Sequence, residues 1–209
     1  MPIFALHTVL FPGQSMGLRV FEERYLALLD DVLPTGGFAV VAIRHGQEVG
    51  GPYEANRVGV TVATEAHVPE DDGTHRLQVA GVERVALIEI VRDDPSAVWQ
   101  TEPFPDEGGA GTDAVQAAVV EMRRYLCVTG QPAELWAVPN EPVAASYALA
   151  AATPGLVPER QALLEIPSAG ERVRRVGAIF RRETALVRAL GATVGSATVG
   201  TAGHDLNPN

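Results

Sequence analysis

The chain contains no lysine, and all 16 of its basic residues are arginine. This absence excludes several kinds of catalytic and nucleotide-binding site, because a P-loop, a Ser-Lys dyad and a Schiff base each require a lysine side chain. The net charge of −10 at pH 7 disfavours nucleic-acid binding by the molecule as a whole. A local patch of arginine remains compatible with RNA.

Cysteine is nearly absent and long apolar runs are lacking. Cys127 is the only cysteine, which excludes an internal disulfide and fits a reducing compartment. We expect it to be a buried, small apolar residue near a helix end. No run approaches the roughly 18 to 20 apolar residues that cross a bilayer, and the first four residues lack the basic start of a signal peptide. These features predict a cytoplasmic protein.

Residues that bind metals or perform acid-base chemistry form no recognisable motif. The five histidines show no i, i+4 pair and no neighbouring cysteine, so no zinc site is expected. Carboxylates gather at Glu70–Asp72 and at Asp93–Asp94, but both groups coincide with turn signals and lack the spacing of a calcium loop. We therefore expect no metal, no cofactor and no catalytic residue, and we predict that the chain is not an enzyme.

The first half of the chain has the patterning of β-strands. Phe38–Ile43 is a continuous apolar run that suits a buried strand, and apolar residues alternate with small or polar ones in Val58–Val62 and Arg76–Val79. Pro69–Gly73 supplies an Asp-Gly pair for a hairpin turn with a left-handed glycine. Val82–Val91 continues the sheet. One early helix is predicted from apolar residues at helical spacing, which are Tyr25, Leu28, Leu29, Val32 and Leu33.

Beyond residue 105 the pattern becomes helical. Residues 106–111 belong to a stretch rich in proline and glycine, which is typical of a linker. We expect Thr112 to cap the first helix, and a capping box of Ser168 and Glu171 to open the last one. The end of the chain is rich in small residues without periodicity. The predicted fold class is α+β, with a β lobe (1–105), a linker (106–111), a helical lobe (112–191) and a disordered tail (192–209).

The chain begins with an ordered set of three motifs: Phe11-Pro12-Gly13, the apolar strand Leu18–Val20, and Phe21-Glu22-Glu23-Arg24-Tyr25 at the opening of the helix. Together they resemble the start of the amino-terminal, substrate-recognising domain of Lon proteases. Gln14–Gly17 departs from that family, in which small apolar residues and proline are usual at this place.

Further segments resemble the same family in the same order. Val58-Gly59-Val60 is similar to one of its strands, and Gly81-Val-Glu-Arg84 is similar to its Gly-x-x-Arg turn between two strands. In the helical half, Glu159–Glu165 and Glu171-Arg172-Val173 resemble its Lys-Gln-x-Leu-Leu-Glu and Glu-Arg-Leu motifs, with Arg160 in place of the common lysine. The likeness extends over residues 1–190.

The resemblance implies a fold and a function. The implied fold is a PUA-like mixed β-barrel lobe with an inserted helix, followed by a C-terminal helical bundle. The implied function is the binding of protein or peptide, with an unfolded or extended polypeptide as partner and a separate protease or chaperone as a further one. A full Lon protease continues into an ATPase and a protease module. Neither fits within this sequence, so the chain is similar to stand-alone forms of the domain.

Aromatic residues are scarce, and three of them flank the predicted linker: Trp99, Phe104 and Trp136. If these side chains are exposed, they anchor an extended apolar peptide, because aromatic rings supply a large contact area at low entropic cost. If they are buried, they hold the two lobes together. They are the candidate peptide-binding residues.

The alternative function is RNA binding by a PUA-like module, based on the arginine-rich last helix. Glutamates interleave with these arginines, and i, i+4 pairing of Glu171 with Arg175 is available. The pattern therefore favours a solvated helix face over an RNA contact. The arginines concerned are Arg172, Arg174, Arg175, Arg181, Arg182 and Arg188.

Overall fold

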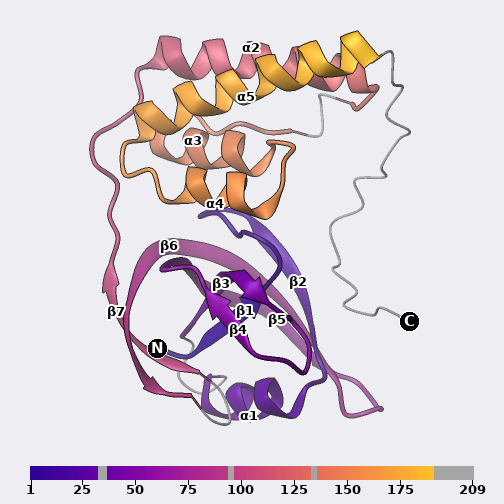
Figure 1. Cartoon of the computed structure of the whole chain (residues 1–209), viewed down its shortest axis with the longest axis vertical. Coiled ribbons are helices and arrows are strands. Elements are labelled where there is room, and N and C mark those ends of the chain that lie inside the picture. The colour runs from indigo at the N-terminus through magenta and orange to yellow at the C-terminus, as the bar shows by residue number, and fades with distance from the viewer. Residues whose placement is uncertain (33–36, 94–96, 133–135, 191–209) are drawn as a thin grey trace. The chain divides into compact units, whose positions relative to one another are not determined.

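The computed structural model describes residues 1–32, 37–93, 97–132 and 136–190 (Figure 1). Within these residues the fold is mixed α/β, with one seven-stranded sheet and five helices. The chain divides into two compact units, of which unit 1 is Met1–Pro105 and unit 2 begins at Asp106. The tail of residues 192–209, for which the sequence predicts disorder, lies outside the described residues.

Unit 1 contains the whole sheet. Its central order is β1-β3-β5-β6-β2, with β4 paired to β3 and β7 paired to β6. The pairing of β1 with β3 is parallel, and the other pairings are antiparallel. The strands are β1 (Ile3–Leu6), β2 (Ser15–Val20), β3 (Phe38–Gly46), β4 (Tyr53–Ala55), β5 (Val58–Pro69), β6 (His75–Arg92) and β7 (Val98–Pro103).

Strand β6 is long and pairs with two different strands along one of its edges. Its first part pairs with β2 and its last part pairs with β7, while β5 follows it on the other edge. Gly81 lies inside β6, so the turn expected at Gly81–Arg84 is wrong. The real turn is the predicted one before it, where Gly73 adopts a left-handed φ of 81°. The expectation of a turn at Gly81–Arg84 rests on the likeness to the family's Gly-x-x-Arg motif, whereas a glycine inside a strand can mark a place where another backbone approaches closely.

The Phe-Pro-Gly turn is hydrogen-bonded to the backbone of Gly81. The amide of Gly13 donates to the Gly81 carbonyl at 2.8 Å, and the amide of Gly81 donates to the Gln14 carbonyl at 2.9 Å. Phe11 is fully buried beside this contact. The first motif of the chain therefore anchors a loop on the middle of β6.

The start of β7 is hydrogen-bonded to the amino-terminal residues of the chain. The amide of Ile3 donates to the Ala97 carbonyl at 3.1 Å, and the amide of Trp99 donates to the Met1 carbonyl at 2.9 Å. Trp99 thereby joins a buried apolar cluster that also includes Val85. These backbone hydrogen bonds fix the position of Trp99, which borders the pocket described below.

Helix α1 (Glu23–Val32) forms as the apolar spacing predicts. Tyr25, Leu28 and Leu29 are buried, and the Tyr25 ring stacks on Phe4 with 3.9 Å between ring centres. Leu33, which completes the predicted face, lies outside the described residues. The helix thus fixes Tyr25, and its neighbour Arg24, at the border of the pocket.

Unit 2 consists of α2 (Thr112–Thr129), α3 (Pro142–Ala151), α4 (Val157–Leu164) and α5 (Ala169–Leu190). Helix α2 packs on α5, and α3 contacts α2, α4 and α5. One half of the capping box predicted for α5 is confirmed, because Ser168 Oγ accepts a hydrogen bond from the Glu171 amide at 3.3 Å.

Two local expectations in α2 are wrong. Gly111 is the N-cap of the helix and Thr112 its first residue, so Thr112 does not cap it. Cys127 is exposed, not buried. Its position lies outside the buried face, which contains Val119, Met122 and Leu126. None of the helices in the described part of the chain is long and apolar enough to cross a membrane.

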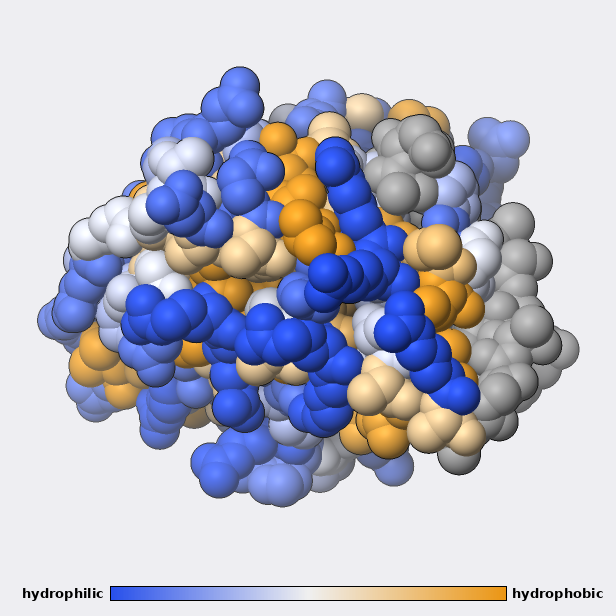
Figure 2. Space-filling model, turned by 90° about the horizontal axis from the view of Figure 1, so that it is seen from above, coloured by the Kyte–Doolittle hydropathy of each residue, from blue (hydrophilic) through white to orange (hydrophobic). Residues whose placement is uncertain are grey.

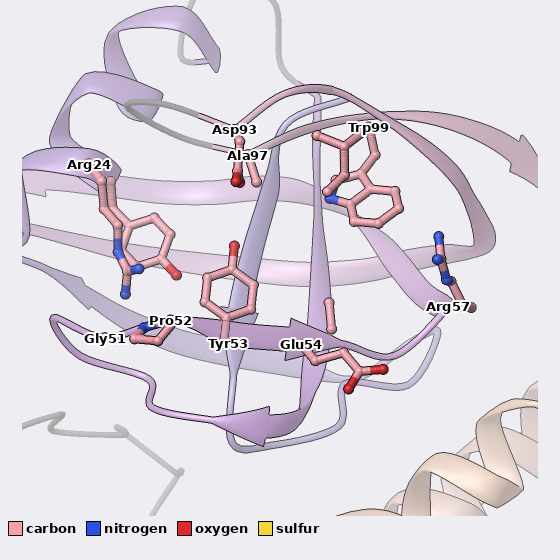
Figure 3. A pocket seen from close by; sticks show the side chains of 12 residues that line it. Arg24, Gly51, Pro52, Tyr53, Glu54, Arg57, Asp93, Ala97 and Trp99 are labelled. Atoms are coloured by element: carbon pink, nitrogen blue, oxygen red, sulfur yellow. The ribbon is translucent and has the colours of Figure 1, made fainter.

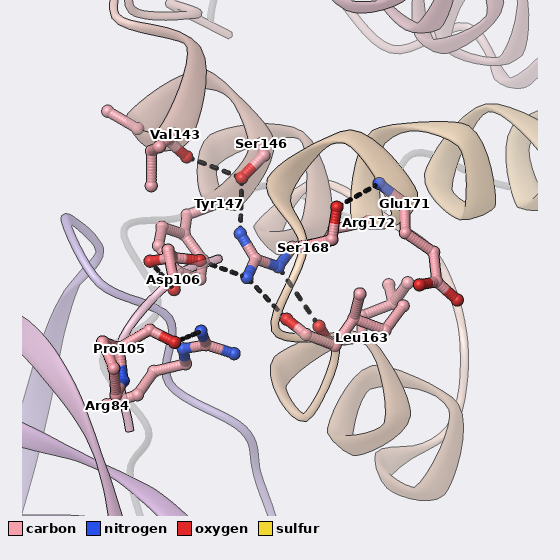
Figure 4. A network of polar contacts seen from close by, with 12 residues as sticks. Arg84, Pro105, Asp106, Val143, Ser146, Tyr147, Leu163, Ser168, Glu171 and Arg172 are labelled. Carbon is pink, nitrogen blue, oxygen red and sulfur yellow. Dashed lines mark hydrogen bonds and ion pairs between the residues drawn. The ribbon is translucent and has the colours of Figure 1, made fainter. Parts of the chain in front are cut away.

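A buried arginine connects three helices of unit 2 (Figure 4). Arg172, at the start of α5, is 0% exposed. Its guanidinium donates to Ser146 Oγ and to Asp106 Oδ1, each at 2.6 Å, and to two main-chain carbonyls, those of Leu163 and Ile166. The sequence grouped Arg172 with surface arginines, but its donors satisfy acceptors inside the unit.

Candidate functional site

Unit 1 contains a pocket of about 650 Å³ (Figure 3). Its lining comes from α1, from β4 with the residues on either side of it, and from the segments around the end of β6 and the start of β7. This volume is within the range of sites that hold a small ligand or a few side chains of a peptide. The lining residues are Arg24, Tyr25, Gly51, Pro52, Tyr53, Glu54, Ala55, Arg57, Ile90, Asp93, Ala97 and Trp99.

Aromatic rings and guanidinium groups are combined in this pocket. Arg24 Cζ lies 4.6 Å from the centre of the Tyr25 ring and 5.7 Å from that of Tyr53. At another part of the lining, Arg57 Cζ lies 5.0 Å from the centre of the Trp99 ring. Cations placed over aromatic faces are attracted by the ring quadrupole. The rings are therefore held in place by cations of the chain itself.

Apolar residues at the end of β6 extend the site beyond the pocket. The register of β6 with β7 shifts between Leu87 and Glu89 and again between Ile90 and Arg92. Such bulges bend a strand and redirect side chains. Ile88, Ile90 and Val91, which we call the β6 ridge, are 45%, 47% and 68% exposed. Ile90 belongs to both the ridge and the pocket lining, so the two surfaces are continuous.

The two pocket tyrosines stay protonated at neutral pH. Burial raises the pKa of Tyr25 and of Tyr53 above the usual 10.0, although Arg24 acts in the opposite direction on both. The Tyr25 hydroxyl donates to the Ala5 carbonyl at 3.3 Å. Both phenols are therefore neutral hydrogen-bonding groups under ordinary conditions.

The raised pKa of Tyr25 predicts alkaline destabilisation. Its raised folded-state value contributes stability that is fully present below pH 10 and is lost as the pH rises further, because the unfolded chain ionises first. One such tyrosine lowers the free energy of unfolding by about 1.4 kcal/mol for each pH unit above this point. In Tyr25→Phe we expect the free energy of unfolding, measured by urea titration, to fall less steeply above pH 10. Parallel slopes for the two proteins would contradict the assignment.

The three aromatic residues predicted from the sequence lie at different places. Trp99 borders the pocket of unit 1 and is 9% exposed. Phe104 is half-buried in unit 1, with Arg84 Cζ 4.7 Å from its ring centre, and it does not line that pocket. Trp136 lines a second pocket of about 360 Å³ in unit 2, together with Met122 and Val138. Their role in peptide binding stays a prediction.

Sequence reasoning missed Tyr53, Ile90 and Asp93 as site residues. Each lies in or beside a short or irregular strand end: Tyr53 begins the three-residue strand β4, Ile90 lies between two register shifts of β6 with β7, and Asp93 follows β6. The usable signal was weak: the alternation of β6 is lost at residues 85–88, where four apolar residues follow one another.

Two of the six arginines of α5 are engaged by other parts of unit 2. Arg172 is buried, and Arg182 makes two hydrogen bonds with the Glu159 carboxylate, at 2.8 and 2.9 Å. The face of unit 2 seen in Figure 2 mixes hydrophilic and apolar side chains. In the described part of the chain, no group of three His, Cys, Asp or Glu side chains is arranged to hold a metal ion.

Residues 1–182 match the family described as the ATP-dependent protease La (LON) substrate-binding domain. The chain belongs to this family. Among curated relatives of this Lon family member, Lon protease 2 of Syntrophobacter fumaroxidans is 26% identical over 184 residues, and Lon protease 1 of Bdellovibrio bacteriovorus is 26% identical over 126 residues. These matches cover 84% and 59% of the chain, but only 23% and 16% of the two proteases.

Solved structures of Lon amino-terminal domains are similar in fold. The Lon N-terminal domain protein from Xanthomonas campestris has a TM-score of 0.64 and 28% identity, covering 85% of this chain and 96% of its own. The N-terminal domain of the Mycobacterium avium complex Lon protease has the same TM-score at 16% identity, covering 86% of this chain and 97% of its own. The match of fold therefore extends over nearly the whole of each neighbour.

Proposed function

We propose that this chain is a non-catalytic module that binds unfolded or extended polypeptide, in the manner of a substrate-recognition domain. Family membership supports this proposal, and the observation that carries it is the amphipathic pocket of unit 1 with the adjoining β6 ridge. Exposed apolar residues beside a concave site are typical of surfaces that bind other proteins. Burial of the client's apolar side chains against Ile88, Ile90 and Val91 is the main attraction.

Finer features of the module are part of the same proposal. Unit 1 acts as a PUA-like barrel lobe and residues 112–191 as a helical bundle, with residues 106–111 linking them. Binding of the client needs no ATP and takes place in the cytoplasm. A separate protease or chaperone receives the bound client.

The proposal is tested by fluorescence anisotropy. The purified chain is titrated against two labelled probes, an unstructured apolar-rich polypeptide without net charge and a single-stranded RNA, each at low and at physiological salt. We expect saturable binding of the polypeptide with little salt dependence, because apolar burial is not screened. Binding of RNA alone with a steep salt dependence would overturn the proposal in favour of the arginine-rich helix, and so would the absence of binding to either probe.

The β6 ridge is tested by a matched pair of variants. Ile90→Ser is expected to weaken polypeptide binding about tenfold, because it removes apolar contact area at the mouth of the pocket. Val68→Ser changes a residue of similar exposure, 52%, on β5 of the same unit, and we expect it to leave the affinity unchanged. Equal effects of the two variants would place the binding surface elsewhere. Trp136→Ala then asks whether the second pocket binds the client instead.

A further inference from the structure

The charged side chains that line the pocket differ in whether they already form ion pairs or hydrogen bonds within the chain. Arg24 forms an ion pair with Glu22 at 3.1 Å, and Glu54 forms one with Arg44 at 3.4 Å. Arg57 donates to the Ile88 carbonyl at 3.2 Å and stands over the Trp99 ring. Asp93 is exposed, and among the described residues no arginine forms an ion pair with it. Asp93 is thus the pocket carboxylate that is available to a ligand.

The Asp93 carboxylate has a polar neighbour within the pocket. Figure 3 shows it pointing toward the hydroxyl of Tyr53, which comes from the opposite side of the cavity. The charge of Asp93 is one of the causes that raise the pKa of Tyr53, after burial, which agrees with this placement. A hydroxyl and a carboxylate together offer acceptors to the several N–H donors of an ammonium or guanidinium group.

The surroundings of Asp93 suit the stem of a long basic side chain. Trp99 and Ile90 are cross-strand partners and both line the pocket, together with the ring of Tyr53. Lysine and arginine bury their methylene stems along apolar surfaces while the charged head stays near water or a partner. The pocket therefore offers an apolar wall and an acidic end within one cavity.

We propose that the pocket selects a basic side chain of the client, with Asp93 and Tyr53 holding its cationic head and the β6 ridge taking the apolar residues beside it. This inference rests on the proposed polypeptide-binding function and specifies its substrate class: unfolded segments in which lysine or arginine adjoins large apolar residues. The net charge of −10 adds a long-range attraction for such segments and repels acidic ones.

Three labelled peptides test this selectivity. They share one set of apolar residues and differ in two positions, which are both lysine, both glutamine or both glutamate. We expect the lysine peptide to bind about fivefold more tightly than the glutamine peptide, which corresponds to about 1 kcal/mol for one partly exposed ion pair. The glutamate peptide is expected to bind most weakly. High salt should narrow the difference between lysine and glutamine.

Two carboxylate variants separate a specific contact from the general negative charge. Asp93→Asn is expected to abolish the preference for the lysine peptide over the glutamine peptide. Asp71→Asn makes the same charge change at an exposed hairpin residue of the same unit, and the preference should persist. A preference that persists in Asp93→Asn, or vanishes in both variants, overturns the inference.

The outcomes for the wild-type chain distinguish the two proposals. Equal binding of all three peptides overturns the selectivity but keeps the polypeptide-binding function. Tighter binding of the glutamate peptide also overturns the proposed selectivity, because the pocket would then bind an acidic side chain through Arg57. Absence of binding by any peptide removes the function itself. A direct readout of the pocket is the emission of Trp99 in a Trp136→Phe background, which should change on addition of the lysine peptide; unchanged emission counts against the pocket.

Discussion

Replacing Arg172 with alanine is expected to lower the free energy of unfolding of unit 2 by about 3 to 5 kcal/mol, the usual cost of removing one partner of a buried ion pair. The side chain is fully buried, and its ion-pair partner Asp106 lies 2.6 Å from Nη2. Tyr147 donates to the other oxygen of Asp106 at 2.6 Å. The carboxylate would remain partly buried with its cation gone.

The loss extends beyond the ion pair. Arg172 also donates to Ser146 Oγ at 2.6 Å and to the carbonyls of Leu163 and Ile166 at 3.3 and 2.7 Å. Its guanidinium carbon stands 4.0 Å from the centre of the Tyr147 ring. A buried acceptor that loses its donor still carries the free-energy cost of removal from water, which no hydrogen bond then offsets. The variant therefore leaves several unsatisfied groups where α3, α4 and α5 meet.

Chemical denaturation followed by circular dichroism measures this effect, with Arg182→Ala as the matched control. Arg182 lies on the same helix and pairs with Glu159 and Glu183 while half-exposed, so its loss should change stability little. The double variant Arg172→Met with Asp106→Asn should recover part of the loss, because it removes both charges together and keeps apolar volume. Similar destabilisation by Arg172→Ala and Arg182→Ala would refute the structural role.

The contrast between Arg172 and Arg182 shows what the sequence of α5 determines. The capping box and the apolar spacing are local signals, and they predict the helix and its start. The burial of Arg172 depends on Asp106, which lies 66 residues earlier in the chain. Helical spacing places Arg172 four residues before Val176, on the buried face of α5, but it does not identify Asp106 as the partner. The sequence therefore predicts the helix but not the ion pair that satisfies its buried arginine.

The same limit applies to unit 1 and to its pocket. Phe38–Ile43 and the helix after Phe21 follow from apolar periodicity, and both form. Strand β4 has only three residues, too few to show a period, yet it supplies Tyr53. Trp99 was selected because tryptophan is scarce, and its pocket arises from the register that places Ile90 opposite it. The register between β6 and β7 shifts twice, and local periodicity does not predict such shifts, so the pocket had to be seen in the structure.

Gly81→Ala is expected to lower the free energy of unfolding of unit 1 by about 2 to 4 kcal/mol. The added methyl group would push the backbone at Phe11 away from strand β6. A methyl group on Gly81 would stand 2.5 Å from the Phe11 carbonyl oxygen and 3.1 Å from Val60 Cγ1. The loop cannot retreat freely, since Gly13 and Gln14 are both hydrogen-bonded to Gly81. Relief of the clash must break these bonds and expose part of Phe11, which is otherwise 0% exposed.

Gly37→Ala is the control, because a methyl group there meets nothing within 4 Å and the residue belongs to the same unit. We expect its free energy of unfolding to stay within about 0.5 kcal/mol of the wild-type value. In denaturant titrations of a Trp136→Phe background, Trp99 emission reports the unfolding of unit 1 alone. A Gly81→Ala midpoint equal to that of Gly37→Ala would show that the loop adapts to a side chain. The Phe-Pro-Gly turn would then contribute little to the stability of the sheet that frames the pocket.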